Sequence, residues 1–63
     1  MEEYNKLLGR YMAATSQLNS LNNIKLSIRR IKEAGYETQE EVLELIEKWV
    51  KIVADIEKEM DKY

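Results

Sequence analysis

The chain lacks several residues on which small proteins rely for stability. None of its 63 residues is cysteine, histidine, proline or phenylalanine, and only two are glycine. The missing cysteine excludes disulfides, and the missing histidine removes most of the common zinc ligand sets. A single domain of this length buries only about 60% of the surface that its unfolded chain exposes. We therefore expect oligomerisation to supply additional stability.

The same absences argue against an enzyme. Serine and threonine hydroxyls have no histidine to activate them, and di-iron sites in helical bundles need Glu-x-x-His motifs that do not occur here. Gly9 and Gly35 are isolated, so there is no glycine-rich phosphate loop. One acidic group recurs at helical spacing, as on a solvated helix face: Glu40, Glu41, Glu44 and Glu47. We expect no catalytic residue, no metal and no cofactor.

Long apolar runs are also missing. No run approaches the roughly 18 residues of a membrane span, and no charged segment precedes an apolar one as in a signal peptide. We expect a cytoplasmic protein that makes no membrane contact. The net charge of −2 argues against a generic nucleic-acid binder, which usually has a basic surface.

The charge that is present is unevenly distributed. Residues 1–34 carry six basic and three acidic side chains, a net +3, whereas residues 35–63 carry four basic and nine acidic ones, a net −5. The two halves are therefore electrostatically complementary, and the segment 33–42, EAGYETQEEV, divides them.

Each half has the apolar period of an amphipathic helix, with steps of three and four residues. The spacing predicts helices over about 3–34 and about 38–62, with a corner at 35–37, in a single domain spanning 1–63. The heptad phase slips between Leu18 and Ile24. Because neither glycine nor proline lies there, we interpret the slip as a local shift of the buried face and not as a break.

Standard capping residues surround the predicted corner. Gly35 suits the left-handed position that ends a helix, and Tyr36 would then pack back on Ile31 in a Schellman motif. Thr38 and Glu41 form the T-x-x-E pattern of a capping box that opens the next helix. A connection of about three residues forces the helices antiparallel.

The apolar stripes of the two helices are too wide to be covered by one neighbouring helix, so an isolated hairpin would leave apolar side chains exposed to water on one side. The sequence thus predicts an all-α fold, an antiparallel helical hairpin that dimerises into a four-helix bundle. Whether the two corners lie at the same end stays open. The predicted dimer core comprises Leu18, Leu21, Ile28, Leu45, Trp49, Ile52 and Ile56.

One stretch is free of charge. Residues 11–24, YMAATSQLNSLNNI, contain no charged side chain although 35% of the chain is charged. A second stripe of small residues crosses it: Ala13, Ser16, Ser20 and Asn23. The stripe either lets another helix of the dimer approach closely or forms a patch that receives a partner protein, because interface cores are depleted of charge.

Three functions are compatible with these features. The leading hypothesis is a homodimeric adaptor or regulator that binds an unidentified protein through its helical faces. The alternative is a small nucleic-acid-binding bundle, since the chain resembles the plasmid RNA-binding protein Rop in length and hairpin form. Its candidate patch would be Lys25, Arg29, Arg30 and Lys32, which otherwise pair with glutamates across the corner. A third possibility is a structural subunit of a larger assembly.

The whole chain, Met1 to Tyr63, also resembles the small helical-hairpin proteins of the Sulfolobus spindle-shaped viruses (fuselloviruses). The resemblance rests on the length, the segment NKLLGRYMAATSQLNSLNN and the hairpin joined at EAGYET. It implies an antiparallel four-helix-bundle dimer, an adaptor function and a place in the host cytoplasm, and it implies no catalytic or ligand residue. The richness in lysine and glutamate fits a hyperthermophilic host.

Overall fold

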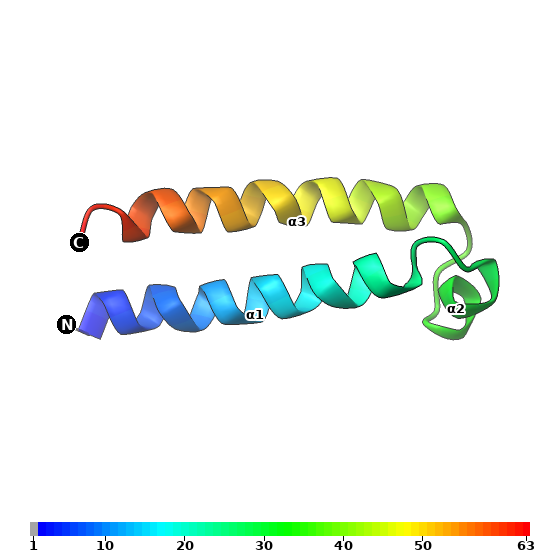
Figure 1. Ribbon diagram of the computed structural model, residues 1–63, viewed down its shortest axis with the longest axis horizontal. Coiled ribbons are helices and arrows are strands. Elements are labelled where there is room, and N and C mark those ends of the chain that lie inside the picture. The colour runs from blue at the N-terminus through cyan, green and yellow to red at the C-terminus, as the bar shows by residue number, and fades with distance from the viewer. Residues whose placement is uncertain (1) are drawn as a thin grey trace.

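The computed structural model describes residues 2–63, and this part of the chain folds into helices without strands. Helix α1 spans Glu2–Ile24, the short helix α2 spans Ile28–Glu33, and α3 spans Gln39–Met60. Figure 1 shows α1 and α3 side by side and antiparallel, with both chain termini at one end and α2 at the other. The helical hairpin that the sequence predicts is therefore present in a single chain.

The first helix is shorter than its apolar period predicts. It ends at Ile24, and the backbone turns through Lys25 and Leu26 before α2 begins. Ser27 caps α2: its backbone is extended, and its hydroxyl accepts a hydrogen bond from the Arg30 N–H at 3.3 Å. The expectation of one helix over 3–34 was wrong, because a serine cap competes with helix continuation at this point.

The end of α2 has the geometry that the sequence predicts. Gly35 has φ of 97°, in the region that side chains disfavour. The Tyr36 N–H donates to the Ile31 carbonyl at 3.1 Å, and the Gly35 N–H donates to the Lys32 carbonyl at 3.0 Å. These two bonds are the Schellman pattern. The Tyr36 ring packs against the core formed around Ile31.

The start of α3 is capped on both sides of Thr38. The Thr38 hydroxyl accepts a hydrogen bond from the Glu41 N–H at 3.2 Å, as the capping box requires. The Glu41 carboxylate accepts from the Glu37 N–H at 3.2 Å, one residue before the position that a full box would use. Gln39 binds further back along the chain, since its side-chain amide donates to the Lys25 carbonyl at 2.7 Å.

The core of the hairpin is thin. The buried hydrophobic residues within 2–63 are Leu7, Ala14, Leu21, Ile31, Val42 and Val53. Leu21, Ile31 and Val42 form the fully enclosed cluster at the α2 end, where all three helices meet. The molecule is a rod of 43 × 16 × 13 Å, so most side chains on α1 and α3 have one face open to solvent.

Candidate protein-interaction site

A hollow of about 440 Å³ lies between α1 and α3, halfway along the rod. Ala13, Ala14 and Gln17 line it from α1, and Trp49, Ile52 and Ile56 line it from α3, with Arg10 at one edge. We call this set the Trp49 groove. Its lining is almost entirely apolar. The hollow exists because the small alanines of α1 leave the larger α3 side chains partly uncovered. A groove of this kind is suited to receive an apolar surface.

The residues of the predicted dimer core are not all in one place. Trp49, Ile52 and Ile56 line the groove and are only half-buried in the single chain. Leu18 and Leu45 are half-buried as well, so apolar surface stays uncovered at these positions in the single chain. Two members differ from the rest: Leu21 is 1% exposed within its own hairpin, and Ile28 lies on α2 and is 59% exposed.

The turn between α1 and α2 exposes apolar side chains. Leu26 is 84% exposed, the most of the large hydrophobic residues in the described chain, and Ile28 is close behind it in sequence. Three main-chain and side-chain bonds fix this turn: Ser27 N–H to the Ile24 carbonyl at 3.0 Å, Ile31 N–H to the Ser27 carbonyl at 2.9 Å, and Gln39 to Lys25. We call residues 25–28 the elbow. Sequence reasoning missed it, although Ser27 directly before an apolar residue was a usable signal.

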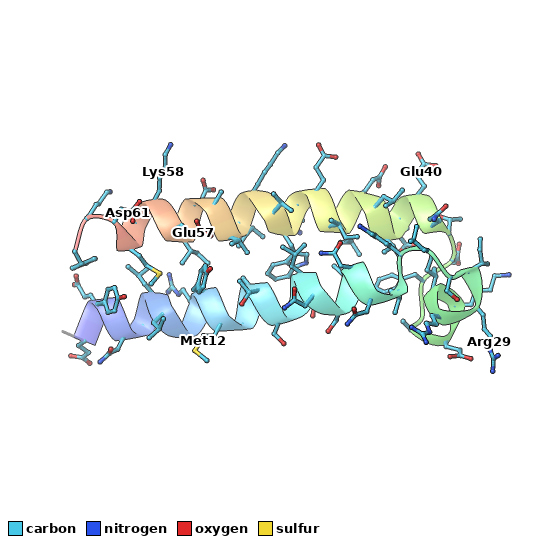
Figure 2. The ribbon with its side chains drawn as sticks, viewed as in Figure 1. Met12, Arg29, Glu40, Glu57, Lys58 and Asp61 are labelled. Atoms are coloured by element: carbon cyan, nitrogen blue, oxygen red, sulfur yellow. The ribbon has the colours of Figure 1, made fainter. Side chains whose placement is uncertain are left out.

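The stripe of small residues is exposed along its whole length. Ala13, Ser16, Ser20 and Asn23 are all exposed in the single chain. Ala13 alone also lines the Trp49 groove. Met12, which adjoins the stripe, is 63% exposed and points away from α3 in Figure 2. The uncharged surface of α1 therefore continues from the groove to the outer face of the rod.

The basic side chains of the α2 region do not pair across the corner as expected. The ion pair found within residues 2–63 lies inside α2 itself, where Arg29 Nε is 3.1 Å from Glu33 Oε1. Arg30 and Lys32 are exposed, and Lys25 is half-buried. Both partners of the ion pair are largely in water, where such pairs contribute little. Arg30 and Lys32 are thus directed to solvent at this end of the rod.

The four glutamates of α3 behave as a solvated face. Glu40, Glu41, Glu44 and Glu47 are exposed, and Glu40 points away from α1 in Figure 2. Nowhere in the described part of the chain do three or more acidic side chains come together in a cluster that could hold a metal ion. The same residues contain no helix that is both long and apolar enough to cross a membrane.

The end of the rod that holds both termini is tied together by Tyr63. Its hydroxyl donates to the Glu3 carboxylate at 2.8 Å, and its ring meets that of Tyr4 edge to face, with centroids 6.2 Å apart. The hydrogen bond to Glu3 raises the pKa of Tyr63, with smaller contributions from burial and the nearby charges of Glu3 and Glu59. The contact links the first turn of α1 to the last residue of the chain, which follows the end of α3 at Met60.

Comparison with known proteins identifies no relative of this chain. No protein-family model matches the chain, and neither a curated protein nor a solved structure matches it.

Proposed function

We propose that this chain is a non-enzymatic adaptor: a homodimeric four-helix bundle that presents paired helical faces to other proteins. The Trp49 groove carries the proposal. A tryptophan is a costly side chain to leave half in water, and Trp49 sits at the middle of α3 beside two aliphatic residues in the same state. The core of the single hairpin is also too thin to account for a stable fold of this size.

A second copy fits the groove better than a small molecule. The lining offers no convergent set of polar groups to orient a ligand, since Arg10 and Gln17 are its only polar members. One flank of the rod, 43 Å long and 13–16 Å wide, is on the scale of the roughly 800 Å² per partner that standard interfaces bury. Closing the groove with a second hairpin gives the four-helix bundle.

The partner-binding face is the small-residue stripe on α1. Once the groove is closed, Ser16, Ser20 and Asn23 stay accessible on the uncharged part of α1, because all three are exposed and none lines the groove. Two-fold symmetry would supply two such faces per dimer, so that one dimer bridges two copies of a partner. The resemblance to the fuselloviral hairpins implies the same role, in a viral protein acting in the host cytoplasm.

A pair of substitutions in one helical turn tests the stripe. Ser20→Arg places a charge on it, whereas Asn19→Arg places the same charge about 100° away around α1. Tagged wild-type and variant proteins are used to capture partners from a host lysate, with the mass of each measured in solution. We expect Ser20→Arg to lose a partner that wild type and Asn19→Arg retain, at unchanged dimer mass. If Ser20→Arg is monomeric, the stripe belongs to the dimer interface and not to a partner site.

Nucleic-acid binding is the second candidate, and the exposure of the basic α2 favours it. Arg29, Arg30 and Lys32 lie at one end of the rod, with no aromatic side chain among them to stack on a base. Binding there would be electrostatic and steeply salt-dependent. Titration against mixed RNA and DNA at two salt concentrations tests it: binding that weakens with salt and disappears in Arg29→Glu would support this function over the adaptor.

A further inference from the structure

The orientation of the two hairpins follows from the surfaces around the Trp49 groove, given the dimer proposed above. The groove opens on one flank, so a two-fold axis must lie between two such flanks. If the axis runs along the helices, α1 of each chain lies on α3 of the partner and both elbows are at one end. If it runs across them, α1 lies on α1, α3 lies on α3, and the elbows are at opposite ends.

The sizes of the lining side chains distinguish these two arrangements. On α1 the lining includes Ala13 and Ala14, and on α3 it is Trp49, Ile52 and Ile56. Placing α1 on the partner's α3 sets small residues opposite large ones at both helix contacts, which is how well-packed cores interdigitate. Placing each helix on its equivalent instead sets small against small on one side and large against large on the other.

The charges beside the groove point the same way. A second hollow, which shares Arg10 with the groove, brings Lys6 of α1 and Glu59 of α3 to the same level of the rod. An axis along the helices keeps that level, so Lys6 and Arg10 of α1, which share the hollow with Glu3, lie at the level of Glu59 on the partner's α3. An axis across the helices brings the end of α3 that carries Glu59 to the start of the partner's α3, which begins with Glu40 and Glu41.

The charges of the two halves bear on the elbow end of the bundle. The half of the chain that contains α1 and α2 has a net charge of +3, and the half that contains α3 has −5. The positive charge lies in residues 25–34, because α1 carries Glu2 and Glu3 against Lys6 and Arg10 and has no net charge. The arrangement with α1 on α3 places the basic α2 beside the glutamates that open the partner's α3, where like charges at the shared end are offset.

The exposed elbow supplies an independent observation. Leu26 and Ile28 are 84% and 59% exposed in the single chain, on a turn that hydrogen bonds hold in place. When both elbows lie at one end, these aliphatic side chains share that end with their equivalents in the second copy. When the elbows lie at opposite ends, each faces the end of the partner that carries Glu2, Glu3, Glu59 and Asp61.

We propose that the two hairpins associate with their elbows at the same end, α1 of each chain packing on α3 of its partner. The bundle then has two unlike ends. One carries both α2 helices with their arginines and lysines, and the other carries all four termini. A partner protein that binds both stripes of the dimer would meet them pointing in one direction along the rod.

Energy transfer between chains tests the arrangement, and the absence of cysteine makes single-site labelling clean. Lys32→Cys places one exposed thiol near the elbow, and Lys62→Cys places one at the other end of the 43 Å rod. Donor-labelled Lys32→Cys chains are exchanged with acceptor-labelled Lys32→Cys chains in one sample and with acceptor-labelled Lys62→Cys chains in another.

We expect strong transfer in the first sample and loss of most of it in the second. The reverse result overturns the proposed orientation while leaving the dimer standing. If neither sample shows transfer under conditions where the chains exchange, the dimer itself is wrong and the orientation falls with it. Equal masses of labelled and unlabelled protein in solution show that the labels do not disturb association.

Discussion

Gln39, the first residue of α3, reaches back across the corner and donates its side-chain amide to the carbonyl of Lys25, at 2.7 Å. The two residues are 14 positions apart, so the bond closes the segment that contains the elbow, α2 and the Schellman turn. The Lys25 carbonyl belongs to the stretch where α1 has already ended, and it would otherwise depend on water. This bond ties the unwound stretch 25–27 to the first turn of α3.

Removing that bond should weaken the fold by a measurable amount. Gln39→Ala leaves a partly buried carbonyl without its partner, which costs about 1 kcal/mol. Asn22→Ala is the control, because Asn22 is exposed on α1 and should change stability by less than about 0.5 kcal/mol. Urea unfolding followed by circular dichroism, at one chain concentration, compares them. Equal midpoints for Gln39→Ala and wild type would show that the bond contributes nothing.

The two glycines should respond to alanine in opposite directions. Gly35 has φ of 97°, where a side chain is strained by roughly 1–2 kcal/mol, so Gly35→Ala should destabilise. Gly9 lies inside α1, and apart from its chain neighbours and the adjoining backbone of the helix no heavy atom lies within 4 Å of the place that an added methyl group would take. Gly9→Ala should therefore stabilise the fold by up to about 1 kcal/mol. Thermal unfolding of the two variants at matched concentration measures both. A stabilising Gly35→Ala would contradict the Schellman geometry.

The enclosed cluster at the α2 end should be the most sensitive part of the hairpin. Leu21 is 1% exposed, and Leu21→Ala should cost about 2–5 kcal/mol, enough to unfold much of a chain of this size. Met12→Ala should cost less than about 0.5 kcal/mol, because Met12 is 63% exposed and points away from α3 (Figure 2). Helix content at 222 nm in the two variants provides the comparison, and similar losses from both would argue against this core.

Much of this architecture could be predicted from the sequence, and the reasons lie in particular residues. The three-and-four spacing of apolar side chains predicts two long antiparallel helices, and Gly35 with Tyr36 predicts the Schellman turn at the right residues. The break after Ile24 was not predicted, because Ile28 and Ile31 continue the apolar period across it. The slip in heptad phase between Leu18 and Ile24 lies directly before the break. The apolar period alone, however, does not distinguish a helix whose buried face shifts from a helix that ends. The structure shows that Ser27 is the N-cap of α2, and this cap marks the point where the first helix has ended.

The candidate site was predictable only in part. Trp49, Ile52 and Ile56 stand out from the sequence as an apolar stripe, and the structure adds that Ala13 and Ala14 leave them half-covered. The opposite behaviour of Leu21, buried within one chain, and of Ile28, displayed on the elbow, depends on the path of the chain after Ile24. Periodicity assigns a face to a residue but does not say whether the same chain or another one covers it.

The link between Tyr63 and Glu3 should be visible in a pH titration. A hydrogen bond to the Glu3 carboxylate raises the pKa of Tyr63 above its ordinary value of 10.0. Because the folded pKa lies above the unfolded one, the contact stabilises the fold fully below pH 10 and is lost as pH rises through the folded pKa. Absorbance titration of the tyrosines, with Tyr63→Phe identifying the Tyr63 component, should show that pKa falling toward 10 in Glu3→Gln. An unchanged pKa in Glu3→Gln would contradict the contact.

Sedimentation equilibrium tests most directly the dimer that we propose to form through the Trp49 groove. Ile52→Asp places a charge in the groove lining, whereas the neighbouring Lys51→Asp changes an exposed position outside it. Wild type and Lys51→Asp should sediment at twice the 7.5 kDa mass of one chain, and Ile52→Asp should shift toward the monomer. Wild-type protein that sediments at 7.5 kDa at every concentration, or an Ile52→Asp variant that dimerises as tightly as wild type, would contradict the account.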